Sequence, residues 1–345
     1  MIRVGLNGFG RIGRAITRIA SDEKKVKIVL INDIDEDKNN LTYLLKYDSI
    51  YGKFNKKVKF NNNSITINNN KIKFFTKKKI DSVPWNKNNV DIVIDATGLD
   101  ENIELSRKLL KKGVKKVLIT NSPNKKVDFY MVLGANEKNY DYKKHNVIST
   151  SICDASALAP ILKAIDEKWN IENGFVTTLH SMLSYQNLLD GSLKSVSNPT
   201  HSWKDYTLGR NSNLSLIPKN TTAINAVEKC LPSLKNKLSG LSFRVPTNIV
   251  CGSDISLKVN KNCSLSELKS FLKNISKIKK NIFKYEEEKL VSIDHVGTDK
   301  SLIIDSNYLN VLNSKMIKII IWYDNEWGYS RRVIDIASLV LNKKI

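Results

Sequence analysis

The chain has 345 residues, 41% of them hydrophobic, and a formal net charge of +22. This length can bury a full-size core and predicts two domains. No apolar run approaches the ~20 residues that cross a bilayer, so we expect no membrane span. An apolar strand pattern starts directly after Met1, which leaves no room for a signal peptide and predicts a cytoplasmic protein.

The distribution of positive charge and the spacing of the cysteines argue against several classes of partner and site. The excess of charge is scattered lysine, without an arginine cluster or interleaved aromatic residues, so nucleic acid is not indicated as a partner. The cysteines lie far apart and form no Cys-x-x-Cys pair, which predicts neither a disulfide framework nor a metal site. They are Cys153, Cys230, Cys251 and Cys263.

The first 150 residues alternate between strand and helix patterns. Residues 2–6 predict a buried strand, and a glycine turn and a helical pattern follow it. Residues 27–32, 91–96 and 116–120 predict further buried strands, each next to a segment of helical length. This alternation predicts an α/β fold with a parallel, doubly wound sheet of the Rossmann type.

The glycine turn matches the pattern of dinucleotide-binding proteins. Its glycines permit a tight turn and a close approach of backbone amides to a pyrophosphate, and Asp33 after the second strand suits the ribose hydroxyls of NAD. The alternative for Asp33 is an ordinary helix N-cap. The predicted turn residues are Gly8, Phe9, Gly10, Arg11, Ile12 and Gly13.

The pattern changes after about residue 151. Residues 156–167 predict a helix, and alternating stretches at 175–179, 241–245 and 251–259 predict a mainly antiparallel sheet in an α+β domain. A strand at 317–322 precedes a C-terminal helix. We therefore expect an NAD-binding domain over residues 1–152, completed by the helix at 325–345, and a catalytic domain over 153–324.

Cys153 and His180 are the candidate catalytic pair. Cys153 lies just ahead of the predicted helix, where the helix dipole would lower the pKa of the thiol and favour a nucleophilic thiolate. His180 ends the predicted strand at 175–179, which could return it to the sulfur. A lone cysteine is more often a small buried hydrophobic residue, and a lone histidine is more often structural.

Six motifs, in order along nearly the whole chain, resemble the NAD-dependent, phosphorylating glyceraldehyde-3-phosphate dehydrogenase family. The resemblance implies a homotetramer of two-domain subunits that acts in glycolysis and gluconeogenesis. The motifs are VGLNGFGRIGR near the start, LLKYDSIYGKF at 44–54, DATG at 95–98, TTLHS at 177–181, LSFRVPT at 241–247 and WYDNEWGYS at 322–330.

The family resemblance also implies the chemistry. Cys153 matches the family's nucleophile, which attacks the aldehyde to form a thiohemiacetal and then a thioester, and His180 matches its base. Asn325 matches the residue that holds the nicotinamide amide, although it also suits a turn, and Thr97 and Gly98 match a turn beside NAD. The implied products are 1,3-bisphosphoglycerate and NADH.

The family binds a substrate phosphate and an attacking inorganic phosphate. This chain keeps only some of the residues that bind these two anions. Arg244 matches an anion-site arginine, and Thr221 matches a threonine for inorganic phosphate. Thr222 replaces a glycine beside it, and Thr222 and Arg210 are further candidates for anion binding. Arg210 is the one arginine between His180 and Arg244, where the family usually carries two or more, and Leu208 stands at the anion-binding position.

Other family positions differ around the nucleophile. Ile152 replaces a serine, Ser156 an asparagine and Leu183 a substrate-phosphate threonine. Asp154 replaces a threonine and places a negative charge where an anion would bind, which at ~4 Å costs about 1 to 4 kcal/mol. The loop at 181–216 is longer than the family's and could alter cofactor affinity or assembly.

These differences leave alternatives to the phosphorylating reaction. The chain could oxidise erythrose 4-phosphate or another aldehyde and release the thioester with water, since the related erythrose-4-phosphate dehydrogenases also lack the threonine at Leu183. A non-catalytic binding or regulatory protein is a further alternative. The retention of Cys153, His180, Asp33 and Asn325 together argues against it.

Overall fold

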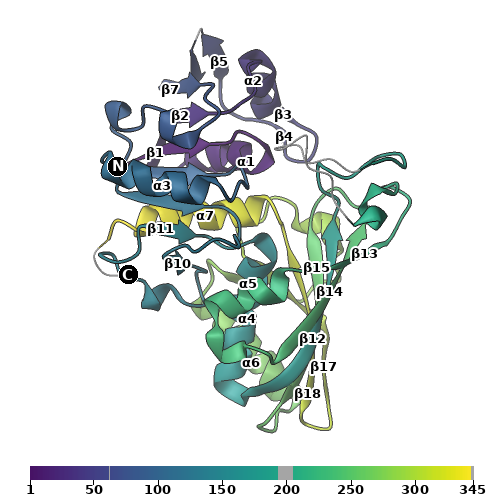
Figure 1. The fold of residues 1–345 in the computed structure, drawn as a ribbon. Coiled ribbons are helices and arrows are strands. Elements are labelled where there is room, and N and C mark those ends of the chain that lie inside the picture. Colours follow the sequence, from purple (N-terminus) through teal and green to yellow (C-terminus); the bar gives the residue numbers. More distant parts are fainter. Residues whose placement is uncertain (62, 193–204, 343–345) are drawn as a thin grey trace. The chain divides into compact units, whose positions relative to one another are not determined.

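The computed structural model describes residues 1–61, 63–192 and 205–342 (Figure 1). The chain forms two compact units. The first contains residues 1–131, 136–152 and 330–345, and the second contains residues 132–135 and 153–329. In the described residues no helix is both long and apolar enough to span a membrane.

The first unit is built on a sheet of nine strands in the order β10-β11-β9-β8-β1-β2-β7-β6-β5. The strands from β10 to β7 are parallel, and the hairpin β5-β6-β7 adds an antiparallel edge. The strands are β1 Ile2–Asn7, β2 Val26–Asn32, β5 Val58–Asn61, β6 Ser64–Ile67, β7 Asn70–Phe75, β8 Ile92–Asp95, β9 Lys116–Ile119, β10 Phe129–Tyr130 and β11 Val147–Ser149, with a separate pair β3 Tyr47–Asp48 and β4 Gly52–Lys53.

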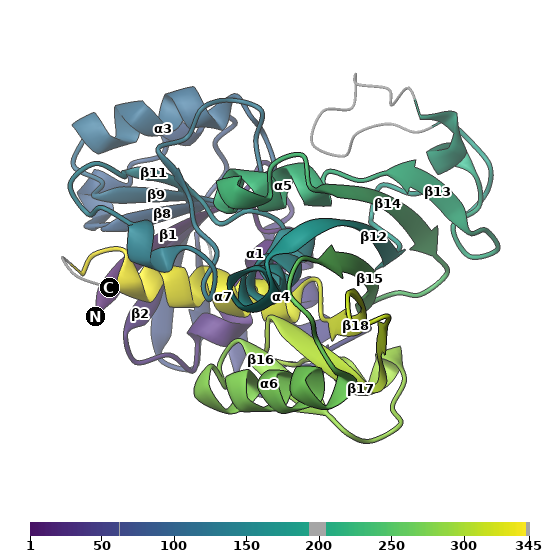
Figure 2. The ribbon, with the colours of Figure 1, turned by 90° about the horizontal axis from the view of Figure 1, so that it is seen from below.

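Helices cover both faces of this sheet. Figure 2 shows α3 Asn102–Lys111 on one side of the strands, and α1 Arg11–Ala20 and α7 Trp327–Leu339 on the other. On the α3 side, Ile103 and Leu109 pack with Val93 and Val117 of the strands and with the buried Trp85. Helix α2 Lys38–Lys46 follows β2, and short 3-10 turns lie at η1 Ile80–Ser82, η2 Asn86–Asn88 and η3 Glu137–Asn139.

The second unit is built on a seven-stranded sheet in the order β13-β14-β12-β15-β18-β17-β16. Pairs β12/β14 and β16/β17 are parallel, and the other four are antiparallel. The strands are β12 Ile171–Ser181, β13 Ile217–Asn220, β14 Leu238–Val245, β15 Cys251–Val259, β16 Phe283–Glu286, β17 Leu302–Leu312 and β18 Met316–Tyr323.

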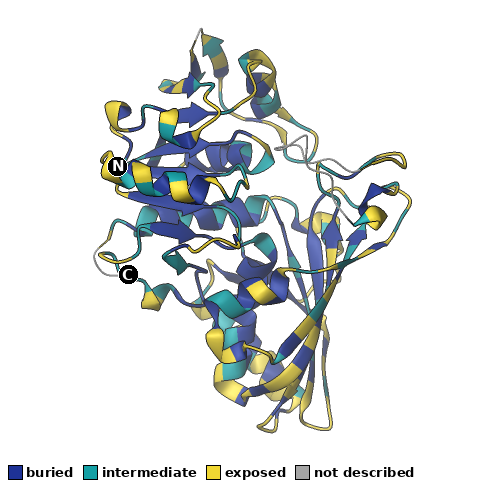
Figure 3. Ribbon diagram, viewed as in Figure 1, coloured by how far each residue is buried: buried dark blue, intermediate teal, exposed yellow. Residues whose placement is uncertain are grey.

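Helices pack on one face of this second sheet. Figure 1 shows α4 Cys153–Trp169, α5 Ala223–Cys230 and α6 Leu265–Ile278 on that side. Short turns lie at η4 Tyr206–Gly209, η5 Pro232–Leu234 and η6 Ser292–His295. Residues of β12 alternate between buried and exposed (Figure 3), because successive side chains of a strand point to opposite faces. Phe175 and Leu179 point to the face without helices.

The predicted fold class is confirmed, with one sheet mostly parallel and the other mostly antiparallel. One helix is longer at both ends than expected. The helix expected at 156–167 begins at Cys153 and continues to Trp169. Its first turn contains Asp154, and a carboxylate there interacts favourably with the positive end of the helix dipole. The candidate nucleophile is therefore part of the helix.

Candidate active site

The glycine turn in the first unit connects β1 to α1. Gly8 has a φ of +95°, and a Cβ there would lie 2.9 Å from the backbone of Ala96, so a side chain is excluded. A Cβ at Gly13 would collide with the carbonyl oxygen of Gly8. At Gly10, by contrast, a Cβ would meet no atom within 4 Å, which leaves open space directly before the helix.

That space can accept an anion. Helix α1 has no side-chain cap at Gly10 and no acidic residue in its first turn, so its first backbone N–H groups face the open side with positive polarity. The Asp33 carboxylate accepts a hydrogen bond from the Phe9 N–H at 2.5 Å and therefore lies beside the turn. Asp37, not Asp33, caps the next helix by accepting from the Asn40 N–H. These features fit a dinucleotide.

A buried polar network joins the ends of β1, β2 and β8. Asn7 donates to Asp95 at 2.8 Å, and Asn32 donates to Asn7 at 2.8 Å. The Thr97 hydroxyl and the Asn102 amide also donate to Asp95. Burial raises the pKa of Asp95, while these donors oppose that shift. The network lies at the carboxyl edge of the parallel strands, where α/β sheets bind ligands.

The sequence alone predicted only part of this edge. It identified Thr97 as beside NAD, but it did not connect Thr97 with Asn7, Asn32 or Asn102. The structure shows that the Thr97 hydroxyl contacts Asp95 at 2.9 Å, and that Gly98 follows with a φ of +73°. The sequence contained a sign of this polar network, because β1, β2 and β8 each end in a short polar residue.

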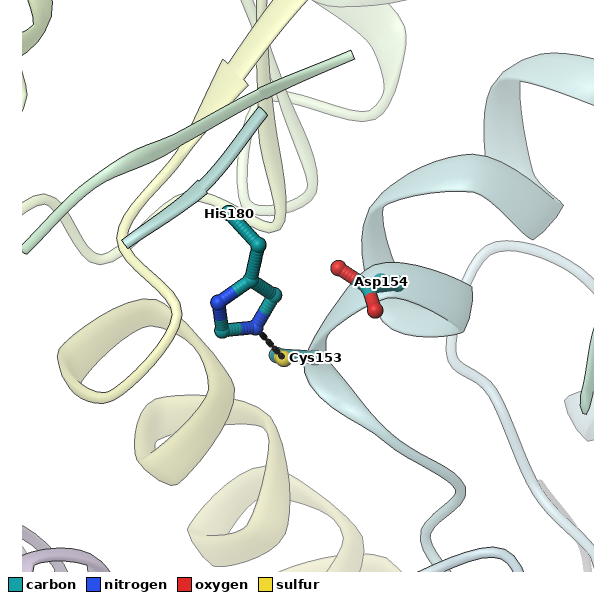
Figure 4. A group of neighbouring side chains, drawn as sticks. All are labelled: Cys153, Asp154 and His180. Carbon is teal, nitrogen blue, oxygen red and sulfur yellow. Dashed lines mark hydrogen bonds between the residues drawn. The ribbon is translucent and has the colours of Figure 1, made fainter. Parts of the chain in front are cut away.

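In the second unit, α4 and β12 bring Cys153 and His180 together. Cys153 is the first residue of α4, and His180 is the penultimate residue of β12. The Cys153 Sγ lies 3.7 Å from the His180 Nε2 (Figure 4). Ser151, two residues before the thiol, has a φ of +62°, a conformation that non-glycine residues rarely adopt and that often occurs at functional sites.

The orientation of His180 is set by its neighbour. Its Nδ1 lies 2.7 Å from the carbonyl oxygen of Ser181, which can only accept a hydrogen bond. The neutral ring therefore carries its proton on Nδ1 and directs the lone pair of Nε2 toward the sulfur. Burial lowers the pKa of His180, which keeps the ring neutral and able to accept a proton. This arrangement suits a base beside a thiol nucleophile.

The expected lowering of the Cys153 pKa is wrong. Burial raises the pKa of the thiol well above its ordinary value, and the negative charge of Asp154 adds to the rise. Arg244 and the backbone N–H of Asp154 act in the opposite direction, but they are the smaller effects. The cost of placing a thiolate in a buried site next to a carboxylate outweighs the effect of the helix dipole.

The Asp154 carboxylate is held by Tyr323, for which the sequence alone predicted no role. The Tyr323 hydroxyl donates to the Asp154 Oδ1 at 2.5 Å, and both side chains are buried. Burial and the adjacent carboxylate raise the pKa of Tyr323, so the tyrosine keeps its proton. The sequence did contain a sign of such a partner, because Asp154 stands where the family has a threonine. A buried carboxylate requires a hydrogen-bond donor.

Removing the negative charge next to the thiol should therefore ease its ionisation. In Asp154→Asn we expect the alkaline limb of the pH profile for iodoacetamide alkylation to move to lower pH. A stabilisation of the thiolate by ~1.4 kcal/mol corresponds to a tenfold faster reaction at a fixed pH below the midpoint. Asp154→Glu, which retains the charge, should keep the wild-type midpoint. Identical profiles for Asp154→Asn and wild type would exclude the electrostatic effect.

Arg244 lies beside His180 on the next strand. The two residues are paired in register across β12 and β14, and both are buried. The guanidinium nitrogens Nε and Nη1 have no hydrogen-bond partner within the described part of the chain. An unpaired buried cation is costly, and guanidinium donors bind carboxylate and phosphate oxygens well. The arrangement provides an anion site next to the catalytic pair.

The other predicted anion residues are placed differently. Thr221 is partly buried, and its hydroxyl oxygen accepts the Ala223 N–H at 3.0 Å, while Thr222 is exposed at the start of α5. Arg210 forms an exposed ion pair with Asp190 at 2.7 Å. Leu208 is fully buried against Ile217 and Tyr185. The long loop falls partly on residues 193–204, which lie outside the described residues.

Asn325 lies in the turn between β18 and α7 and is buried. Its Oδ1 accepts a hydrogen bond from the Ser181 hydroxyl at 3.1 Å, next to His180 in the chain. The amide NH₂ group of Asn325 is consequently the end that can donate to a ligand. Asp324 shapes the turn by accepting from the backbone N–H groups of Glu326 and Trp327. The turn role and a ligand role are compatible.

Comparisons with known proteins agree with this geometry. Residues 2–102 match the model described as glyceraldehyde 3-phosphate dehydrogenase, NAD binding domain, and residues 152–325 match the corresponding C-terminal domain. The chain is 40% identical over 347 residues to glyceraldehyde-3-phosphate dehydrogenase 2 of Nostoc sp., covering 99% of each. It is 38% identical to the glyceraldehyde-3-phosphate dehydrogenases of Eremothecium gossypii and Geobacillus stearothermophilus, each again with 99% coverage of both chains. The chain belongs to the glyceraldehyde-3-phosphate dehydrogenase family and is an NAD-dependent oxidoreductase.

Proposed function

We propose that the chain oxidises and phosphorylates glyceraldehyde 3-phosphate to 1,3-bisphosphoglycerate with NAD, in glycolysis and gluconeogenesis. The observation that carries the proposal is the group formed by Cys153, His180 and Arg244. A thiol and a base lie 3.7 Å apart, and two buried nitrogens of the neighbouring guanidinium have no hydrogen-bond partner among the described residues. A thiol nucleophile beside an anion site suits a phosphorylated aldehyde and a phosphate acceptor.

The reaction would start with proton transfer from the Cys153 thiol to the His180 Nε2. The thiolate attacks the aldehyde carbon, and a carbon–sulfur bond forms as the carbonyl π bond opens. The oxygen takes the proton back from His180, which gives a thiohemiacetal and leaves His180 neutral. His180 then accepts the proton of the adduct's hydroxyl as a hydride ion leaves the same carbon, which produces a thioester. NAD, when bound, supplies the acceptor for that hydride.

The second half-reaction would need an anion held near the sulfur. An oxygen of inorganic phosphate attacks the thioester carbon, the carbon–sulfur bond breaks, and the Cys153 thiol is regenerated with a proton from His180. We propose that Arg244 and Thr221 hold anions for this step, and that Thr222 at the start of α5 adds a hydroxyl. Arg210 lies in a surface ion pair, which argues against the role that the resemblance assigned to it.

We also propose roles for the cofactor residues. The backbone at Gly8, Phe9, Gly10, Arg11, Ile12 and Gly13 would hold the pyrophosphate, since Gly10, the residue before α1, has no side chain that could cap the helix. Asp33 would accept hydrogen bonds from the ribose and disfavour a 2'-phosphate. Thr97 and Gly98 would lie beside the cofactor, and Asn325 would donate to the nicotinamide amide.

A homotetramer remains a prediction from the family resemblance. The sheet face of the second unit without helices supports it. Phe175 is 70% exposed and Leu179 41% exposed, and Leu241 is paired with Thr177 on the same face. Exposed apolar side chains grouped on one face are typical of protein–protein interfaces. A cytoplasmic location also remains a prediction.

One observation favours a second candidate function. Asp154 places a carboxylate oxygen within 4.8 Å of the Cys153 sulfur, where it could act as a general base for water. Water would then release the thioester as a carboxylic acid without a phosphate acceptor. Leu183, in place of a substrate-phosphate threonine, is compatible with erythrose 4-phosphate or another aldehyde as the substrate.

The deciding experiment measures NADH formation by the purified protein with glyceraldehyde 3-phosphate or erythrose 4-phosphate, each with and without inorganic phosphate. Phosphate-dependent turnover of the triose supports the proposed reaction. Turnover that is independent of phosphate would contradict the proposed reaction and indicate the hydrolytic reaction. A preference for erythrose 4-phosphate would indicate that the tetrose is the substrate. Cys153→Ser provides the blank for each condition.

Arg244 should carry most of the anion binding. We expect Arg244→Leu to lower kcat/KM for the phosphorylated aldehyde by about 10- to 150-fold, because a hydrogen bond to a charged group contributes roughly 1.5–3 kcal/mol. Arg210→Leu, which removes an exposed arginine of equal charge, should have little effect. If both variants lost activity equally, the net charge of the protein, and not a local anion site, would explain the loss.

A further inference from the structure

We propose that Cys153, Asp154 and His180 form a binding site for a thiophilic divalent metal ion such as Zn²⁺, and that the bound ion blocks the nucleophile. Each residue offers one ligand atom, and these atoms all lie within 4.8 Å of one another. Figure 4 shows the carboxylate and the imidazole on either side of the sulfur. The inference goes beyond the proposed function and does not depend on which aldehyde is oxidised.

The spacing of the ligand atoms suits a tetrahedral ion. Metal–ligand bonds of ~2.0–2.3 Å place the ligand atoms of a tetrahedral zinc site about 3.3–3.7 Å apart. The Cys153 Sγ and His180 Nε2 are already 3.7 Å apart. From the 4.8 Å limit, the Asp154 oxygen needs to approach the other two ligand atoms by at most about 1.5 Å, which a side-chain rotation can provide.

The ligands are also oriented by further contacts, as in known zinc sites. A metal-bound histidine usually donates its second ring N–H to a carbonyl or carboxylate oxygen, and His180 lies this way against the Ser181 carbonyl. The Asp154 Oδ1 accepts from Tyr323, which leaves Oδ2 as the oxygen for the ion. These contacts reduce the conformational freedom that binding would otherwise remove.

Charge explains why Asp154 is the decisive ligand. Binding releases the thiol proton to solvent, so a thiolate and a carboxylate balance the two positive charges of the ion, and no electron is transferred. Arg244 is close enough to act on both Cys153 and His180 electrostatically, and it opposes a cation. Without Asp154 the site would keep a positive charge beside this arginine and would have only two protein ligands.

Occupation of the site should inhibit the reaction. The ion would take the sulfur lone pair that attacks the aldehyde and the Nε2 lone pair that accepts the thiol proton. Three protein ligands leave a fourth position for water. We therefore expect reversible inhibition by Zn²⁺ that a chelator relieves, with Asp154→Asn requiring at least about 10-fold more zinc for the same inhibition.

The direct test is titration of metal-free protein with Co²⁺, followed by displacement with Zn²⁺, in the absence of aldehyde, phosphate and NAD. We expect a thiolate-to-cobalt charge-transfer band and the intense visible bands of a four-coordinate ion. Asp154→Asn should weaken binding at least about 10-fold. Cys153→Ser should abolish the charge-transfer band, whereas Cys251→Ser, which removes the neighbouring thiol, should retain it.

Two results would overturn the site. Equal metal affinity of Asp154→Asn and wild type would exclude the carboxylate as a ligand, and a charge-transfer band that persists in Cys153→Ser would place the ion on another thiol. Asp154→Thr, a second uncharged variant, replaces Asp154→Asn if the latter unfolds. The titration contains no substrate, so a failure to bind metal would not contradict the proposed reaction. Equally, an absence of turnover would not contradict a positive metal titration.

Discussion

Cys153→Ser is expected to lower kcat/KM for NADH formation by at least about 10⁴-fold, the scale seen when the nucleophile of a covalent mechanism is removed. The reason is chemical, because the hydroxyl of serine ionises at a far higher pH than a thiol, and a base such as His180 cannot produce its alkoxide. The serine preserves the size and hydrogen-bonding ability of the side chain. Steady-state NADH formation and the loss of rapid alkylation by iodoacetamide check the expectation.

Cys263→Ser is the matched control. Cys263 is a buried thiol in the same unit, its Sγ contacts the Ser264 carbonyl oxygen, and burial raises its pKa to about 11. We expect this variant to retain activity near wild type. If activity survived in Cys153→Ser but disappeared in Cys263→Ser, Cys153 would not be the nucleophile.

His180→Asn is expected to lower kcat/KM by about 10²- to 10⁴-fold, the usual contribution of a positioned general base. Asparagine can still donate to the Ser181 carbonyl oxygen, but it offers no basic nitrogen at the position of Nε2. The loss should be concentrated in kcat, because proton transfer belongs to the chemical steps. Pre-steady-state NADH formation measures this step directly.

His295→Asn tests whether any buried histidine would have the same effect. His295 is buried and stacks on Trp322 with a ring distance of 6.0 Å, and we assign it no part in the reaction. Its replacement should affect stability more than turnover. The double variant Cys153→Ser/His180→Asn should be little worse than Cys153→Ser, because the two side chains act as a unit. Fully multiplicative losses would contradict that coupling.

Local patterns predicted the fold because they reflect which face of each element is buried. The apolar runs of β1, β2, β8 and β9 are buried on both faces, as parallel strands covered by helices on two sides must be. The alternation in β12 and β18 corresponds to a sheet with helices on one face. The start of α4 was not predicted, because Asp154 has low intrinsic helix propensity. Asp154 is favourable here because it lies in the first turn, at the positive end of the helix dipole.

The candidate site was predicted less completely. Cys153 and His180 were selected from the residues and the family resemblance, and the structure places them together. The absence of a predicted metal site followed from the lack of cysteines and histidines close together in the sequence. The Cys153–Asp154–His180 group is instead produced by folding, since β12 returns His180 to the start of α4.

The sequence by itself determined the glycine turn with Asp33, the order of strands and helices, and the identity of the reactive side chains. These features depend on neighbours in the chain, on side-chain periodicity and on chemical type. Tertiary structure alone decided that Asp33 contacts the turn and that Tyr323 donates to Asp154. It also decided that Arg244 is buried with two nitrogens that find no partner in the described part of the chain. It also reversed the expected direction of the Cys153 pKa, because the energy of a charge depends on the burial and the charges around it, which residues distant in the sequence supply.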